Sequence, residues 1–355
     1  MKKKILGLAL TAALALTLAG CGASGGSSGS GTAAGGTSGS GSGSASSGEG
    51  AAEKAMYDGE VILGSSTWVG YAPLYLADQM GFFDECGADV TVQVFENKND
   101  SRSSLAAGRI QGMSTTIDTH VMSAASGVDL TMVLVEDTSS GGDGLIVRNE
   151  ITSVEKLAGK TVGLDTSGGA SYFWFQYLLN QHNMTLDDVV AVNMSSGDAG
   201  AAFVAGELDA AATWEPWLSN ARETDFGTVL IDSSETPGVI VDALAMDREF
   251  AESYPGTVEA ICQGWYMALA YMETNPDEAY DIMKDFTGNE TGEELQATME
   301  AEVTFYDQAG NIDYFENEIA DITKMASDLW LDNGLIESEP DLDLMIDGSF
   351  LGTLD

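Results

Sequence analysis

The residues best suited to bind a small molecule are aromatic and acidic side chains that follow predicted strands. Trp68 and Tyr71 follow the first apolar run of the folded part, and Trp214 and Glu215 follow a later one. An aromatic face beside a carboxylate can hold a cation or an amine. The alternative is that the aromatic residues pack in the core and Glu215 caps the next helix. We favour ligand contact for Trp68, and the sequence leaves both alternatives open for the others.

Carboxylates also gather where the chain changes direction. Asp118 lies between a predicted strand and a predicted helix, so it either contacts a ligand or caps that helix. Glu136, Asp137 and Asp143 lie where we expect the chain to cross from one lobe to another. The basic residues near these sites, which we expect at the solvated surface, are Lys98, Arg102 and Arg148.

A polar loop of small residues forms a third candidate site. Thr166, Ser167 and Gly168 lie between a predicted strand (161–164) and a strongly apolar helix (170–181). Small residues let a ligand approach backbone N–H groups at a helix end, which carries about half a positive charge. The alternative is an ordinary turn that caps the helix.

Short strands alternate with helices from residue 59 onward, and the chain after residue 255 is almost entirely helical in pattern. The predicted strands are 60–64, 89–95, 130–135, 144–147, 161–164, 189–194, 208–213, 228–231 and 239–245. The predicted helices include 71–80, ended by Gly81, and 101–107, 154–157, 170–181 and 198–205. Such alternation favours parallel α/β sheets with a helical tail packed on one of them. We expect two lobes joined by crossovers near 141–144 and 237–242, with ligands bound between them.

The N-terminus has the pattern of an export signal. Three lysines (2–4) precede a short apolar run, and small residues then lead to Cys21. This junction resembles the lipobox of bacterial lipoproteins, in which the cysteine is acylated, although an ordinary secreted protein could carry a chance cysteine here. Residues 22–50 are almost wholly Gly, Ser, Ala and Thr, which predicts a flexible linker.

The charge balance limits the kinds of partner that the chain can bind, and the cysteine content limits its disulfides and metal sites. The chain holds 56 acidic and 14 basic residues, for a net charge of -42. This balance argues against nucleic acid and against an anionic lipid surface as partners. Cys86 and Cys262, the only cysteines after Cys21, either form one disulfide or stay free, and their spacing predicts no metal site.

Five segments, in order, resemble a known family. They are Trp68–Ala77 (WVGYAPLYLA) closed by Gly81-Phe82-Phe83, then 143–147 (DGLIV), 157–163 (LAGKTVG), 206–210 (GELDA) and 214–217 (WEPW). Together they resemble the nitrate, sulfonate and taurine family of ABC-importer binding proteins, over roughly residues 59–280. None of the five is specific by itself, and the resemblance rests on their common order.

The resemblance implies a two-lobed type II periplasmic-binding-protein fold. Each lobe would be a mostly parallel sheet flanked by helices, with the helical C-terminal segment packed on the first lobe. The implied organisation is a signal peptide (1–20), the lipidated Cys21 and linker (21–56), lobe 1 (57–142), lobe 2 (143–239), and the return to lobe 1 with the C-terminal helices (240–355).

The resemblance also implies a binding function. The chain would be a monomer anchored by its lipid on the extracytoplasmic face of the cell membrane, without a cofactor. There it would capture a small solute and deliver it to an ABC permease and its ATPase subunit. Family ligands are nitrate, alkylsulfonates, taurine or a thiamine-pyrimidine precursor.

Residues 115–118 and 139–143 also resemble a branch of the family found beside urea- and guanidine-using enzymes. This resemblance and the acid-rich site lead us to expect a ligand with a cationic or amine end, such as zwitterionic taurine or a guanidinium compound. Buried carboxylates would be unfavourable beside a plain anion. Two other functions are open. A sensory lipoprotein could use the same site. A related enzyme branch makes the thiamine pyrimidine with a cysteine-rich motif, iron and a modified lysine, and this sequence has no such cysteine cluster.

Overall fold

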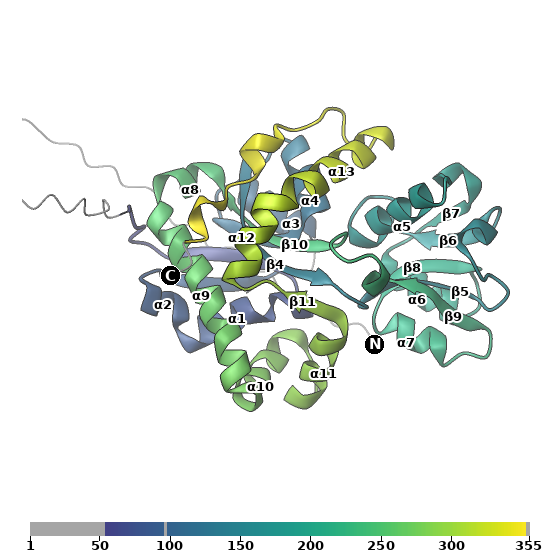
Figure 1. Ribbon diagram of the computed structural model, residues 1–355, viewed down its shortest axis with the longest axis horizontal. Coiled ribbons are helices and arrows are strands. Elements are labelled where there is room, and N and C mark those ends of the chain that lie inside the picture. Colours follow the sequence, from purple (N-terminus) through teal and green to yellow (C-terminus); the bar gives the residue numbers. More distant parts are fainter. Residues whose placement is uncertain (1–53, 96–97, 353–355) are drawn as a thin grey trace, which may run out of the picture. The chain divides into compact units, whose positions relative to one another are not determined.

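The computed structural model describes residues 54–95 and 98–352, without the side chain of Lys98 (Figure 1). The expected signal peptide, Cys21 and nearly all of the Gly/Ser segment lie outside the described residues. Within the described ranges, no helix has both the length and the apolar character needed to cross a membrane.

The first sheet is built from segments far apart in the chain. Its six strands lie in the order β11 (Val303–Phe305), β4 (Leu130–Ser139), β10 (Val241–Asp247), β3 (Gly112–Thr116), β1 (Val61–Ser65) and β2 (Val90–Val94). β1 pairs in parallel with β2 and β3, whereas β10 runs antiparallel to β3 and β4. Every residue of β4 is buried, as expected for a central strand covered on both faces.

The second sheet is formed by the middle of the chain. Its five strands lie in the order β7 (Val190–Asn193), β6 (Thr161–Leu164), β8 (Ala210–Trp214), β5 (Asp143–Arg148) and β9 (Gly227–Asp232). β6 is parallel to β7 and β8, and β5 is antiparallel to β8 and β9. We call each sheet with its flanking helices a lobe.

Both sheets are mixed, whereas the sequence led us to expect mostly parallel ones. The difference comes from the strands that carry the chain between lobes. β4 leads through a short turn directly into β5, and β10 brings the chain back. No crossover helix precedes β5 or β10, so each can run antiparallel to its neighbours.

Helices cover the first sheet on both faces (Figure 1). The long helix α9 (Pro255–Thr274) packs against α1 (Ala72–Met80), α2 (Phe82–Cys86) and β4. On the other side, α4 (Ile117–Ala125) packs against α13 (Ile319–Asp332). The remaining helices of this lobe are α3 (Lys98–Ala106), α8 (Arg248–Ser253), α10 (Pro276–Thr287), α11 (Gly292–Glu302) and α12 (Gln308–Asn317). The helical C-terminal part therefore packs on the first lobe, as predicted.

Helix α1 begins and ends where the sequence indicates. Pro73 lies in its first turn, where a missing N–H is harmless. Gly81 ends it in the left-handed conformation, with φ of 73°. The second lobe carries α5 (Ala170–Gln181), α6 (Ser196–Val204) and α7 (Trp217–Arg222).

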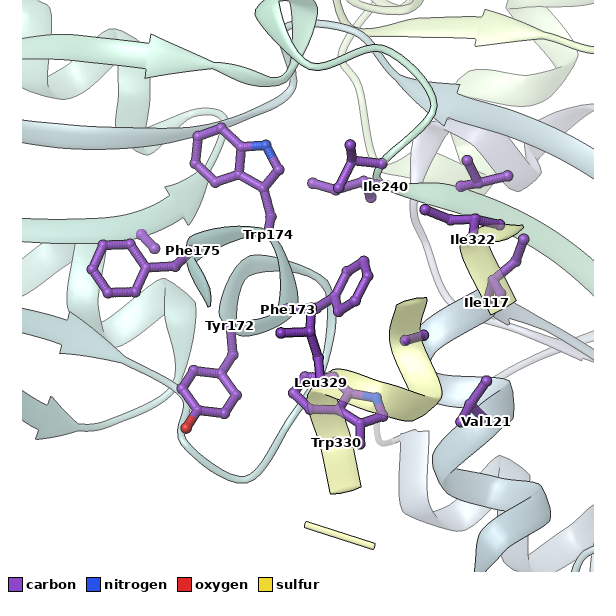
Figure 2. Close-up of a cluster of buried hydrophobic side chains, with 14 of the residues drawn as sticks. Ile117, Val121, Tyr172, Phe173, Trp174, Phe175, Ile240, Ile322, Leu329 and Trp330 are labelled. Atoms are coloured by element: carbon purple, nitrogen blue, oxygen red, sulfur yellow. The ribbon is translucent and has the colours of Figure 1, made fainter. Parts of the chain in front are cut away.

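Aromatic side chains join the two lobes (Figure 2). Trp330 on α13 is fully buried and stacks on Tyr172 of α5, with ring centroids 5.8 Å apart. Phe173, also on α5, lies 5.6 Å from the same indole. Ile117 and Val121 of α4 belong to the same apolar cluster. Apolar contact between α5 and the helices of the first lobe thus holds the lobes together in this conformation.

The sequence prediction does not include β11, α2 or α8. Strand β11 has only three residues and follows α11 directly, so it is too short to show periodicity. Helix α2 occupies the segment Phe82–Cys86. The sequence pattern marks the start of this segment only as the close of the first family-like segment and does not predict a helix there. Cys86 and Cys262 are free thiols, which decides between the two alternatives for them.

Candidate functional site

Strand ends from distant parts of the chain meet at one edge of the first sheet. In the pairing register, Asp242 at the start of β10 lies opposite Thr116 at the end of β3 and opposite Asp137 near the end of β4. In the second sheet, Asp143 at the start of β5 lies opposite Trp214 at the end of β8. Polar residues about 100 positions apart are therefore brought together by strand order alone.

A β-bulge in β4 shapes this edge. Val135 pairs with Ala243 and Asp137 pairs with Asp242, so Glu136 is an extra residue between them. Bulges redirect side chains and are frequent beside functional sites. The Glu136 carboxyl accepts a hydrogen bond of 2.8 Å from the Ser114 hydroxyl on β3.

Five buried carboxyl groups form what we call the acidic cluster. Each is 6% exposed or less, and the members are Asp118, Glu136, Asp137, Asp143 and Asp242. The charges of these groups repel one another: Asp137 and Asp143 both act on Asp242, and Glu136 acts on Asp137. The cluster draws members from both lobes, since Asp143 begins β5 of the second sheet.

Neutral groups donate hydrogen bonds to four of the five carboxyls of the cluster, Glu136, Asp137, Asp143 and Asp242. The Tyr71 hydroxyl donates to Asp242, and Trp68 Nε1 donates to Asp137 Oδ1 at 3.3 Å. The Ser139 hydroxyl donates to Asp143 Oδ2 at 2.9 Å. Ser171 in the first turn of α5 donates to Asp143 Oδ1 at 3.5 Å. Burial raises the pKa of Tyr71 well above its usual value, so its hydroxyl keeps its proton and can donate.

Two carboxylate oxygens of the cluster have no hydrogen-bond partner. They are Glu136 Oε2 and Asp137 Oδ2, and both side chains are fully buried. Buried polar atoms are normally satisfied, so such an exception calls for a functional or structural reason. Gly70 makes room for one of them, because a Cβ atom added there would lie 2.0 Å from Asp137 Oδ2.

Burial shifts four of the five acids of the cluster, all but Asp118, toward their protonated forms. Desolvation is the largest cause for each, and it raises the pKa of Glu136, Asp137 and Asp242 well above the usual range. The pKa of Asp143 rises to about 6, although its bonds from Ser139 and Ser171 oppose the shift. Without a positive partner, these groups retain protons at a pH where exposed carboxyls have lost them.

Glu302 belongs to the site although sequence reasoning missed it. Burial, together with the charges of Glu215 and Asp143, raises the pKa of Glu302 to about 7. Gly142 separates it from Trp68: a Cβ atom on Gly142 would lie 3.0 Å from the indole and 3.2 Å from Glu302 Cβ. Glu302 is the last residue of α11, directly before the three-residue strand β11, and the sequence prediction marks no boundary there.

The backbone N–H groups of Thr166 and Ser167, in the polar loop after β6, do not donate to the acidic cluster. The Thr166 N–H donates to Asn193 Oδ1, and the N–H of Ser167 donates to Asp165 Oδ1. Gly168, with φ of 107°, packs against Met122 of α4, where a Cβ atom would lie 2.6 Å from the sulfur. Thr166 and Ser167 thus donate hydrogen bonds to residues outside the acidic cluster.

Trp214 is the last residue of β8, and Glu215 lies in the turn that follows it. The Glu215 carboxyl accepts hydrogen bonds from the Ser219 N–H at 2.9 Å and from Arg222 at 3.1 Å, so it stabilises the start of α7. This is the helix-capping alternative left open by the sequence. The Trp214 side chain is 39% exposed, whereas Trp217 packs against Gly200 of α6.

Asp118 does not cap its helix. The N-cap of α4 is Thr116, and Asp118 lies in the first turn with its side chain buried beside Asp143. Arg148 also departs from expectation, because its guanidinium binds the carbonyl oxygens of Gly206 and Leu208 and does not simply face solvent.

Two surface hollows lie apart from these residues. One, of about 340 Å³, lies along α13 between Asp321 and Asp332, and the other, of about 480 Å³, lies beside Glu339 and Pro340. Their linings include none of the acidic cluster. We take the cluster as the candidate site because it combines burial, unpartnered polar atoms and residues from both lobes.

The two-lobed α/β fold is similar to the solved structures of two periplasmic binding proteins. The fold resembles the crystal structure of the aliphatic sulphonate binding protein SsuA from Escherichia coli, with a TM-score of 0.68 and 19% identity over 81% of this chain and 92% of that one. It also resembles the nitrate-binding protein NrtA from Synechocystis PCC 6803, with a TM-score of 0.63 and 14% identity over 82% and 86% of the two chains. The two-lobed fold class predicted from the sequence is confirmed.

The chain belongs to the NMT1-like family, whose model matches residues 55–285. It is 26% identical over 199 residues to the taurine-binding periplasmic protein of Escherichia coli, covering 55% of this chain and 61% of that protein. The chain spans just under two thirds of the length of the first curated relatives it matches. The names of these relatives describe binding proteins and not enzymes.

Proposed function

We propose that the chain is the extracytoplasmic solute-binding component of an ABC-type importer, and that a small organic solute binds at the acidic cluster. The observation that carries the proposal is the set of buried carboxyls with unpartnered oxygens at the junction of the lobes. Membership of a family with named binding proteins supports it. A permease and its ATPase would be the partners, and acylated Cys21 would anchor the chain.

The fold suggests how binding would work. The chain passes between the lobes at the turn after β4 and again before β10, so two short connections can act as a hinge. The cluster is covered in this conformation, and a solute would enter when the lobes separate. A solute that contacts Asp137 on one lobe and Asp143 on the other would favour closure, because it interacts with both only in the closed form.

A binding screen with the full chain, purified in detergent, tests the proposal. Thermal unfolding would be followed with nitrate, alkylsulfonates, taurine, urea, guanidinium and small amines, and hits would be confirmed by calorimetry. A ligand at 100 times its dissociation constant stabilises the folded state by about 2.7 kcal/mol. Trp68→Ala should abolish the stabilisation and Asp285→Asn, on the exposed face of α10, should retain it. If no solute stabilises the chain, the proposed function is wrong.

The anchor is tested separately. Cys21→Ser should release the chain from the membrane fraction of its host, because one lipid chain or more would no longer be attached. A control with Cys86→Ser should stay in the membrane fraction. Equal membrane association of the Cys21→Ser chain would contradict the lipid anchor.

A sensory lipoprotein remains the alternative to an importer subunit. Both would bind the same solute, so uptake distinguishes them. Host cells that lack the chain should take up the labelled solute more slowly if the chain serves an importer, and at an unchanged rate if it only reports the solute.

A further inference from the structure

The two connections between the lobes are hydrogen-bonded to each other. The first runs from Ser139 at the end of β4 to Asp143 at the start of β5, and the second runs from Ser233, directly after β9, to β10. The Ser139 N–H donates to the carbonyl oxygen of Ile240, directly before β10, at 3.0 Å. The Gly141 N–H donates to the Ser233 hydroxyl at 2.7 Å. The connections therefore form one joint and not two separate hinges.

Ser233 is buried at the centre of this joint. Its side chain is 1% exposed. Its hydroxyl oxygen lies 2.7 Å from the Gly141 nitrogen, 2.9 Å from Ser139 Oγ and 3.4 Å from the Asp143 nitrogen. Ser233 begins a single turn of 3₁₀ helix, and this turn presents the hydroxyl of the second connection to three atoms of the first.

The groups around Ser233 fix the direction of its own hydrogen bond. A serine hydroxyl carries one hydrogen. Two of the three contacts are backbone N–H donors, so Ser139 Oγ is the acceptor for the Ser233 hydrogen. The hydrogen of Ser139 then goes to Asp143 Oδ2, at 2.9 Å. The bonds form a chain that runs from the Gly141 N–H through two hydroxyls to a carboxyl of the candidate site.

We propose that Ser233 is a positioning residue of the candidate site, which orients the Ser139 hydroxyl onto the Asp143 carboxylate from the other connection between the lobes. Hydrogen bonds in a chain polarise one another, so Ser233 also strengthens the bond that Asp143 accepts. The effect is largest on the ionised carboxylate, because bonds to a charged group are about twice as strong as neutral ones. The role of Asp143 in binding rests on the proposed function, whereas the chain of hydrogen bonds can be tested without a solute.

Other titrating groups face Asp143. It repels carboxyls from four other elements, namely Asp118 of α4, Asp137 of β4, Asp242 of β10 and Glu302 at the end of α11. A change of pH alone therefore does not isolate the contribution of Ser233. A comparison with Asp143→Asn does, because asparagine can still accept from Ser139 but carries no charge. The neighbouring acids are the same in every variant.

A double-mutant cycle measures the link between Ser233 and the charge of Asp143. Urea unfolding of the full chain, without a solute, would compare the wild type, Ser233→Ala, Asp143→Asn and the double variant at pH 8 and pH 5. Burial raises the pKa of Asp143 to about 6, so its carboxyl is mainly ionised at pH 8 and mainly protonated at pH 5. We expect a coupling of about threefold in the unfolding equilibrium constant at pH 8, and a smaller one at pH 5. No coupling at pH 8, or equal coupling at both pH values, would overturn the proposal.

Three further variants separate the hydroxyl from its surroundings. Ser234→Ala makes the same substitution at the next position, where the side chain is exposed and donates to Asp232, so it should show no coupling to Asp143. Ser233→Thr keeps the hydroxyl and should also show no coupling, even if its extra methyl group lowers stability at both pH values. Coupling as strong as that of Ser233→Ala would show that the shape of the side chain matters and not its hydroxyl, and would overturn the proposal. If Ser233→Ala does not fold, Ser233→Cys replaces it, because a thiol is a weaker donor and acceptor.

The proposed function and the role of Ser233 fail independently. If no solute stabilises the chain, the proposed function is wrong, and the coupling between Ser233 and Asp143 still decides whether Ser233 positions that carboxyl. If a solute binds and the coupling is absent, the binding function stands and the positioning role of Ser233 is wrong.

Discussion

Gly70 lies so close to the Asp137 side chain that only a glycine fits at position 70. A Cβ atom at position 70 would lie 2.0 Å from Asp137 Oδ2 and 2.5 Å from the Trp68 indole nitrogen. The glycine of the family-like segment is therefore required because it contacts a carboxylate 67 positions away in the sequence. At this scale the site depends on the absence of a side chain as much as on the presence of others.

Gly70→Ala should destabilise the chain by ~1–3 kcal/mol, the usual range for overpacking a close-packed site. It should also weaken solute binding, because Asp137 must move. Urea unfolding and calorimetry measure the two effects. Gly197→Ala in α6 is the matched control, since its nearest neighbouring atom is 3.9 Å from the added Cβ. Equal stability of both variants would contradict the proposed close approach.

Glu302→Gln should stabilise the chain at pH 8 and change little at pH 4.5. The folded-state pKa of Glu302 is about 7, above the value of 4.5 for a free side chain. A raised carboxyl pKa favours the folded state at low pH, and this contribution is lost as the pH rises through 7. Because the side chain is partly exposed, we expect a gain of only ~1–2 kcal/mol at pH 8. Urea unfolding at both pH values checks it, with Glu337→Gln at the surface as control; an equal effect at both pH values would rule out the assigned cause.

Among the elements, α13 links the site to the contact between the lobes. Its Trp330 indole donates a hydrogen bond of 2.9 Å to the backbone carbonyl of Asp118 and packs on two rings of α5. The helix therefore touches the first turn of α4, which carries a member of the acidic cluster, and the start of α5, which carries Ser171. A substitution in α13 should therefore change both the stability of the folded chain and its affinity for a solute.

Trp330→Ala should destabilise the chain by ~3–5 kcal/mol, the range for truncation of a large buried aromatic side chain. Trp330→Phe keeps most of the apolar contact but removes the indole donor to the Asp118 carbonyl, so it should cost ~1–3 kcal/mol. Chemical unfolding measures the free energy of unfolding of both variants and so ranks their stability. If Trp330→Phe were as damaging as Trp330→Ala, the hydrogen bond and not the packing would dominate.

For the whole molecule, the buried acids predict how stability varies with pH. Burial raises the pKa of Asp143 to about 6 and that of Glu302 to about 7, and it also raises the pKa of Glu136, Asp137 and Asp242 well above the usual range. The folded state therefore binds more protons than the unfolded chain above pH 5, and its stability falls as the pH rises through these values. The net charge of -42 acts in the same direction by self-repulsion.

We expect the melting temperature of the ligand-free chain to rise as the pH is lowered from 8 to about 5. The measurement is a series of thermal unfolding scans at constant ionic strength. A melting temperature that falls steadily from pH 8 to 6 without ligand would contradict the assigned protonation of the cluster.

Local patterns in the sequence determined the class of fold and several element ends. Apolar runs of period two and helical stretches with caps indicated the α/β lobes, and Pro73 and Gly81 marked the two ends of α1. These features depend on a few neighbouring residues, so they can be read without knowing the rest of the structure. The same holds for the motifs that resemble the binding-protein family.

Only the tertiary structure decided which polar residues meet. Asp242 and Glu302 join the site because β10 lies between β3 and β4 and because the three-residue β11 pairs with β4. The bulge at Glu136 and the capping role of Glu215 depend likewise on register and on a partner several residues away. Such contacts follow from strand order and burial, which couple residues 100 or more positions apart, and no local pattern in the chain encodes them.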